Sequence, residues 1–187
     1  MAFVLIAPCG CAPHFTLRAP EAGAPPEARL AAYAELAPAN VRIVEYTDNY
    51  QRTTYADQIE LRDGRKIRHI EDLRPVVADD SRAAHDIDRA ESQARTANWL
   101  YVAGIAGLIA GSVLAVRDLA VNGPDHRGTP FYLGCGLGIG GVITLPIAMS
   151  FGGRSNEAGI SAAKHYDDGL RRRLALCKGE QGVVPCQ

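Results

Sequence analysis

The chain has 187 residues, a formal net charge of -1 and a sequence pI near 6.5. This balance provides no field that attracts nucleic acid, and no run of Lys and Arg is interleaved with aromatic residues, so we exclude nucleic acid as a partner. A mean hydropathy of -0.07 is typical of a soluble domain, but here it averages two long apolar blocks with polar flanks. The largest polar piece, residues 12–97, is too small for a large enzymatic core.

Residues 1–11 form an apolar run that ends in small residues and two cysteines, Cys9 and Cys11. The run resembles the end of a bacterial lipoprotein signal peptide, which is cleaved before a cysteine that is then acylated. The resemblance implies lipidation of Cys9 or Cys11. A secretory signal also has a basic segment before its apolar run, so we expect translation to start further upstream. The alternative is a short hydrophobic strand with two incidental cysteines.

Residues 12–40 predict a linker followed by one short helix. The first part is rich in Pro, Ala and Gly, which is typical of a linker. Leu30, Tyr33 and Leu36 then recur at three-residue steps, which predicts a helix over 26–36 that Pro38 ends.

Residues 41–77 predict a small antiparallel β unit. Apolar and polar residues alternate over 41–46 and 55–61, and the pair Asp63-Gly64 precedes a third strand candidate. Asp-Gly between alternating segments is a strong hairpin signal, because both central residues of a type I′ turn need positive φ. Such a unit has a thin core and typically needs support from a neighbour or from the membrane surface.

A mostly polar helix is predicted over 80–97, with Asp80 or Ser81 as its N-cap. We expect it to continue into the first of two apolar blocks, 98–117 and 130–152. A helix that crosses a bilayer needs roughly 20 mostly apolar residues, and both blocks qualify. The polar loop 118–129 between them is short, which predicts a two-helix transmembrane hairpin.

Small residues recur along both apolar blocks, in the first at four-residue steps and in the second as a cluster of glycines. Lipid provides no hydrophobic drive between helices, so close contact through small residues is the usual source of association. The helix-packing candidates are Ala103, Gly107, Gly111, Ala115, Gly134 and Gly138. We expect them to join the two helices of one chain; the alternative is that a remaining glycine face forms an oligomer.

Gly136, Gly138 and Gly141 also match the spacing G-x-G-x-x-G of a dinucleotide-binding loop. That motif follows a strand and opens a helix of a βαβ unit, with an acidic residue about 20 positions later. Here it lies inside a continuous apolar segment. We therefore assign no cofactor to it.

The end of the chain predicts an amphipathic helix over 155–176 and a tail over 177–187. The apolar face of this helix comprises Ala163, Tyr166, Leu170 and Leu174. Cys177 and Cys186 bracket a segment whose glycines and proline favour a tight reversal, which predicts a small disulfide loop. Disulfides persist in oxidising compartments such as the periplasm; the alternative is two reduced thiols.

No arrangement of residues predicts catalysis or a metal site. Histidines occur at His14, His69, His85, His126 and His165 and form neither HExxH nor HxH spacing. No nucleophile elbow or paired carboxylate in an apolar context is present, and Cys9 with Cys11 lacks the second pair that zinc needs. We expect a non-enzymatic protein with no cofactor, metal or small-molecule substrate.

The order of these elements resembles that of uncharacterised lipoprotein-like envelope proteins from GC-rich bacteria. Those proteins pair an N-terminal lipobox with glycine-rich membrane segments and a late helix carrying Ala-x-x-Tyr-Asn, which Ala163 and Tyr166 match here and Asp167 does not. The fold we expect is an α+β membrane protein, a transmembrane hairpin with a small N-terminal antiparallel β unit and flanking amphipathic helices. The resemblance implies a location in the bacterial envelope and no known activity.

The orientation of the hairpin is predicted differently by two features. The segments that flank the hairpin carry more arginines than its loop does. The positive-inside rule would therefore place both termini in the cytoplasm. A lipidated or disulfide-bearing chain has them outside. We favour the inner membrane with periplasmic termini, and arginines 171–173 then contact anionic head groups or lie in solvent.

Two functions follow from this architecture. The first is an envelope protein that binds membrane lipids and a partner, either another envelope protein or a second copy of the chain. The second is a glycine-zipper oligomer that forms a pore. A pore needs polar residues facing its lumen, and the apolar blocks contain few, so we favour the first.

Overall fold

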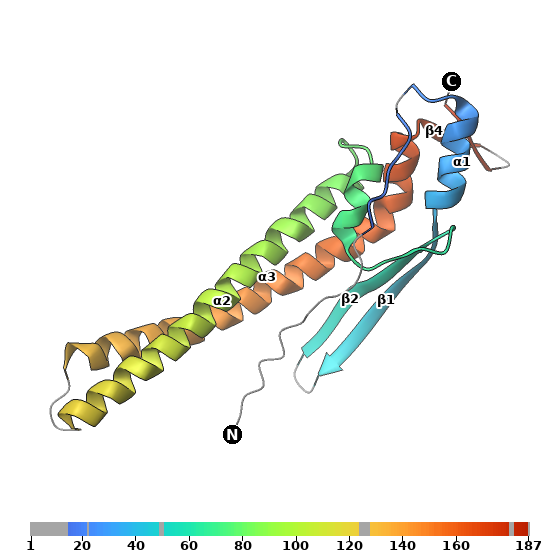
Figure 1. The fold of residues 1–187 in the computed structure, drawn as a ribbon. Helices are drawn as coiled ribbons and strands as arrows, with labels where there is room; N and C mark the ends of the chain where they lie inside the picture. Colours follow the sequence, from blue (N-terminus) through green and yellow to red (C-terminus); the bar gives the residue numbers. More distant parts are fainter. Residues whose placement is uncertain (1–14, 22, 49–50, 124–127, 180–181, 187) are drawn as a thin grey trace. The chain divides into compact units, whose positions relative to one another are not determined.

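The computed structural model describes residues 15–21, 23–48, 51–123, 128–179 and 182–186; Cys9, Cys11, His14 and His126 lie outside them. The chain is mostly helical, with two long apolar helices and two small antiparallel sheets (Figure 1). It divides into a first unit (Met1–Val44, Ala56–Ala84 and Ala162–Gln187) and a second unit (Glu45–Tyr55 and His85–Ser161).

The first helix, α1 (Pro26–Leu36), covers the residues over which a helix is predicted. Proline stands at its start, where the missing N–H has no intrahelical partner to lose. At its end Ala37 has extended backbone (φ -61°, ψ 144°), as expected for a residue before proline. The N–H of Ala37 donates to the carbonyl of Tyr33 at 2.9 Å.

The first sheet has the strand order β1-β2-β3, with β1 spanning Pro38–Asp48, β2 Gln51–Leu61 and β3 Lys66–Ile67. Strands β2 and β3 are antiparallel, with Ile59 opposite Ile67. The Asp63-Gly64 turn lies between them, so the predicted hairpin is present. The type I′ turn is wrong, because Gly64 has positive φ (+88°) and Asp63 does not.

Two strand predictions are wrong in extent. The third strand, expected over 65–70, has only two residues, because the chain turns into the 3-10 helix η1 (Ile70–Val76), which buries Leu73 and Val76 in the core. The first two strands are longer than predicted, since β1 continues to Asp48 and β2 begins at Gln51.

The core of the first unit gathers side chains from α1, β2, β3, η1 and the end of α3 (Thr129–Arg173). Tyr166 is fully buried, and its hydroxyl donates to the carbonyl of Leu36 at 3.0 Å. Burial raises the pKa of Tyr166 well above that of free tyrosine. The other large buried side chains are Leu17, Leu36, Ile59, Leu61, Ile67, Leu73, Val76, Val77, Leu170 and Leu174. The predicted apolar face of the last helix is therefore buried.

Helix α2 (Arg82–Asn122) continues without a break from its polar start into the first apolar block, as expected. Ser81 rather than Asp80 caps it: the Ser81 hydroxyl accepts from the N–H of Ala84 at 3.2 Å. Helix α3 is also continuous, so the separate helix predicted to begin at residue 155 is wrong. Ser155 does not cap a new helix; its hydroxyl donates across to the carbonyl of Ala90 at 2.8 Å.

Beyond α3 the chain forms a short antiparallel hairpin of β4 (Leu176–Gly179) and β5 (Gly182–Pro185). The chain leaves the helix through Ala175, whose φ of 49° is left-handed. Cys177 and Cys186 are joined by a disulfide, with their Cα atoms 5.1 Å apart. Within the first unit, the Arg29 guanidinium donates to the carbonyl of Leu174 at 3.2 Å and so satisfies an orphan carbonyl at the end of α3.

Candidate functional site

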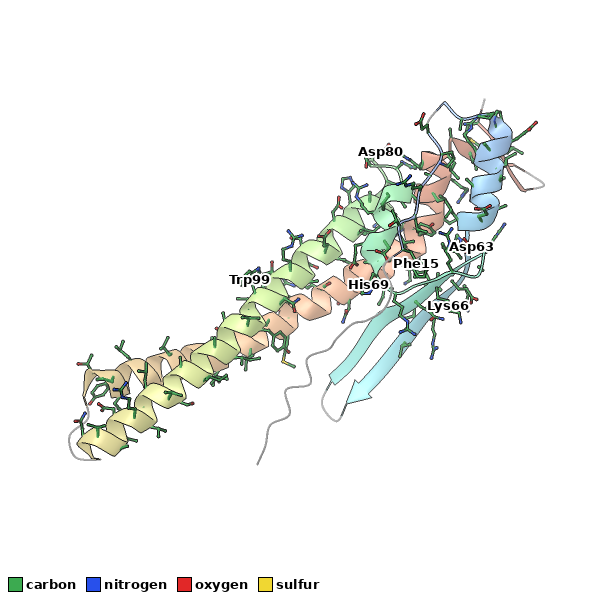
Figure 2. The ribbon with its side chains drawn as sticks, viewed as in Figure 1. Phe15, Asp63, Lys66, His69, Asp80 and Trp99 are labelled. Carbon is green, nitrogen blue, oxygen red and sulfur yellow. A yellow bond between two sulfur atoms is a disulfide. The ribbon has the colours of Figure 1, made fainter. Side chains whose placement is uncertain are left out.

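Among the residues that the structure describes, exposed apolar surface is concentrated on one stretch of α2 and α3. Apart from Ile43 and Val184, the large hydrophobic side chains described as exposed lie between Trp99 and Met149. Trp99 lies on α2 (Figure 2). Its side chain is 70% exposed. Both helices are long and apolar enough to cross a membrane, and only 11% and 17% of their most apolar windows are buried, unlike the core helices of a soluble protein.

Within the second unit, three glycines bring α2 and α3 into backbone contact. A Cβ added to Gly111 would lie 2.5 Å from the carbonyl oxygen of Gly134 and 2.6 Å from the nitrogen of Gly138. One added to Gly134 would lie 2.6 Å from the carbonyl oxygen of Gly111, and one added to Gly141 would lie 2.6 Å from that of Gly104. Any larger residue at these positions would push the helices apart.

The helix-packing prediction is right in kind and partly wrong in its residues. Ala103 is exposed on α2, whereas Gly104, which was not predicted, approaches Leu145 of α3. A constant step of four residues drifts by about 40° per step around a helix of 3.6 residues per turn, while a step of seven drifts by only about 20°. The contact stripe therefore adds Gly104, seven residues before Gly111, to the predicted set. The predicted Gly107 and Ala115 also lie in it: a Cβ added to Gly107 would lie 3.1 Å from the carbonyl oxygen of Leu137, and one added to Gly134 would lie 2.8 Å from the nitrogen of Ala115.

Gly136 and Gly140 of α3 do not serve this contact, since a Cβ added to either would meet nothing within 4 Å. The backbone of Gly138, as predicted, does contact Gly111, although a Cβ added to Gly138 itself would point into open space. Gly138 also lines an apolar groove of about 430 Å³ along one side of the helix pair. The groove is lined by Leu108, Gly111, Ser112, Ala115, Gly134, Cys135, Gly138, Ile139, Val142 and Ile143, and Cys135 carries a free thiol.

A buried carboxylate closes the turn of the hairpin. Asp118 is 4% exposed, and its two oxygens accept from the Asn122 side-chain amide at 2.7 Å and from the N–H of Gly128 at 2.8 Å. The second bond satisfies a backbone donor at the start of α3. Sequence reasoning did not predict this role of Asp118. The available signal was that Asp118 lies four residues before Asn122, on the same helix face, and that Gly128 lies two residues before Pro130, at the start of the next helix.

Two hydroxyl groups inside the apolar stretch, those of Ser112 and Thr144, are satisfied by their own helices. Ser112 donates to the carbonyl of Leu108 at 2.7 Å, and Thr144 donates to that of Gly140 at 2.6 Å. Neither donor therefore needs water or a polar neighbour.

The first unit holds a small polar cluster around Tyr33. The Tyr33 hydroxyl donates to a carboxylate oxygen of Asp167 at 2.7 Å, and the Arg171 guanidinium pairs with the other oxygen at 3.1 Å. Burial and the Asp167 carboxylate raise the pKa of Tyr33 to about 12. The cluster ties α1 to α3 within this unit.

Among the described residues, no group of three His, Cys, Asp or Glu side chains lies close enough to hold a metal ion. No known family, curated protein or solved structure matches the chain. Function is therefore inferred from the residues and contacts of the protein itself.

Proposed function

We propose that the protein is a non-enzymatic, membrane-anchored component of the bacterial cell envelope. On this proposal the hairpin of α2 and α3 crosses the membrane, and the first unit outside it binds a partner or supports an assembly. The observation that carries the proposal is the contrast in burial between the two units. Leu, Ile and Val side chains are buried in the first unit and exposed along the hairpin.

The exposed Val, Leu and Ile side chains of the hairpin are more stable in lipid than in water. Burying one Val, Leu or Ile side chain away from water is worth roughly 1.5–3 kcal/mol, so a belt of them facing water would be strongly unfavourable. On α2 the uncharged stretch between Arg95 and Arg117 is about 32 Å long at 1.5 Å per residue. That length matches a hydrocarbon core of about 30 Å.

Aromatic side chains support the same placement. Trp99 and Tyr101 lie near the start of the apolar stretch of α2, and Phe131 with Tyr132 lies at the start of that of α3. Because the two helices run in opposite directions, these pairs belong to opposite ends of the hairpin. Aromatic rings at both ends are typical of the two membrane interfaces.

The disulfide is the basis for placing both termini in the periplasm. A bond between Cys177 and Cys186 persists in an oxidising compartment, and a hairpin returns the chain to the side from which it entered. Lipidation of Cys9 or Cys11 would place the N-terminus on that side too. The arginines of the flanks favour the opposite orientation, so an experiment has to decide between the two.

A partner-binding role is supported by the sheet of the first unit. Strand β1 stands at the edge of the order β1-β2-β3 and pairs with β2 on one side. An edge strand presents unpaired backbone donors and acceptors, to which another chain can add a strand. The partner we propose is another envelope protein or a second copy of this chain.

A second candidate function, a glycine-zipper oligomer, is favoured by Gly136 and Gly140. These two glycines are four residues apart on α3, open to the surroundings and unused in the contact with α2, and such spacing lets two membrane helices approach closely. A water-filled pore is disfavoured, because Ser112 and Thr144 satisfy their hydroxyl donors within their own helices.

Thiol labelling in bacterial cells tests the location and orientation together. Intact spheroplasts are treated with a membrane-impermeant reductant and then with a maleimide of high mass. We expect Cys177 and Cys186 to be labelled in unbroken spheroplasts only after reduction. Labelling that occurs without reduction and only after lysis would place the first unit in the cytoplasm and overturn the proposed orientation.

A further inference from the structure

A pocket of about 340 Å³ lies at the loop end of the hairpin, within the second unit. Its wall is part apolar and part polar: Leu114, Val121 and Pro130 provide the apolar part, and Arg117, Asp118 and Asn122 provide the polar part. The volume falls within the range of small-molecule sites in proteins. The pocket is thus large enough for a ligand that has both an apolar and a charged portion.

The polar side of the pocket offers a cation with free donors. Both oxygens of Asp118 are engaged by Asn122 and Gly128. Arg117 is exposed, and among the residues that the structure describes its guanidinium makes no hydrogen bond or ion pair. A planar guanidinium with free donors suits the two oxygens of a phosphate group.

The position of the pocket along the hairpin indicates where the ligand comes from. Arg117 is the first charge after the uncharged stretch of α2, and Pro130 opens the apolar stretch of α3. The edge-to-face pair Phe131 and Tyr132, with ring centroids 5.7 Å apart, follows directly. On the proposed function, this is the level of the lipid head groups.

We propose that this pocket binds the phosphodiester head group of a membrane glycerophospholipid. Arg117 donates to the phosphate oxygens, and Leu114 and Pro130, on the membrane side of the pocket, contact the start of the acyl chains. The Asp118 carboxylate in the same wall repels a free phosphate, which carries more charge, and suits a zwitterionic head group. The site rests on the proposed membrane insertion and adds to it a defined lipid contact.

Native mass spectrometry of the purified full chain in detergent tests the site, with dioleoyl-phosphatidylethanolamine as the probe. We expect one lipid to bind, and Arg117→Gln to weaken its binding by about tenfold, through the loss of a charge-assisted hydrogen bond to the phosphate. Arg154→Gln is the matched control. Arg154 is also exposed and lies just beyond the other end of the apolar stretch of α3, where its guanidinium stacks over Phe151 at 5.9 Å.

The outcomes distinguish failure of the lipid site from failure of the proposed membrane insertion. Equal lipid binding by wild type and Arg117→Gln, or equal weakening by both substitutions, overturns the site. Displacement of the lipid by millimolar inorganic phosphate also overturns it, by assigning the pocket to a soluble anion. Quenching of Trp99 fluorescence by brominated lipids in vesicles reports insertion separately: a quenched Trp99 with no loss in Arg117→Gln refutes the site alone.

Discussion

Substitution of Gly111 by alanine tests how tightly the two apolar helices pack. The added methyl carbon would lie 2.5 Å from the carbonyl oxygen of Gly134, whereas ordinary contacts of this kind begin near 3.4 Å. The backbones must therefore separate by about 1 Å, and both are held in helices that cannot bend locally without loss. The reciprocal contact of Gly134 with Ala115 is released by the same shift.

The expected cost follows from two opposing effects. Overpacking of this kind destabilises proteins by roughly 1–3 kcal/mol, and a gap of 0.5–1 Å elsewhere along the interface removes about a quarter to a half of the dispersion energy there. Alanine gains about 0.5–1 kcal/mol over glycine within a helix. We expect Gly111→Ala to lower the free energy of unfolding by about 1–2 kcal/mol.

Gly136→Ala is the matched control, because its added carbon meets nothing within 4 Å on the same pair of helices. We expect it to be neutral or slightly stabilising, since only the helix preference remains. Stability is measured by titrating the protein from a mild detergent into sodium dodecyl sulfate while the fluorescence of Trp99, the single tryptophan, is followed. Equal stability of the two variants would refute the close backbone contact.

Three further changes test other contacts. Asp118→Ala removes the acceptor of the Gly128 N–H, so we expect a loss of about 1–3 kcal/mol in the same detergent titration; no loss would show that the turn closes without it. Tyr166→Phe leaves the buried carbonyl of Leu36 without its donor, and we expect thermal unfolding of the first unit to shift to lower temperature by an amount equivalent to about 1–2 kcal/mol. The neutral form of Tyr33 is favoured in the folded state, with a pKa of about 12 against 10.0, so its stabilising effect is complete below pH 10 and is lost as the pH rises towards 12. Circular dichroism across this window should show a steeper loss of stability in wild type than in Tyr33→Phe, and identical pH profiles would contradict the assignment.

Some elements could be predicted because local residues determine them. Prolines bracket α1, and its three apolar side chains follow the period of a helix, so its bounds were recoverable. The disulfide is another case, since Cys177 and Cys186 lie on adjacent strands of a hairpin whose turn residues are visible in the sequence. The length of an uncharged stretch likewise indicates a long apolar helix without knowledge of its neighbours.

Other features depend on contacts between distant segments, which a single sequence does not contain. The rotation of α2 against α3 decides that Gly104 faces the partner helix and Ala103 does not. From the sequence, Asp118 is predicted to be an ordinary polar residue of the loop. Its role depends on the N–H of Gly128, ten residues later, which donates to its carboxylate. Helix α3 continues through residue 155, and the Ser155 hydroxyl donates to the carbonyl of Ala90 on α2, a distant partner that the local sequence does not reveal.

The central claim is that the hairpin of α2 and α3 lies in a bilayer, and Trp99 reports on it most directly. Trp99 is the single tryptophan, is 70% exposed and lies at one end of the apolar stretch. In vesicles containing brominated phospholipids, we predict strong quenching of its fluorescence, strongest for bromines near the head-group end of the acyl chain, and weak quenching by aqueous iodide. Full quenching by iodide with no effect of the brominated lipids would contradict the account.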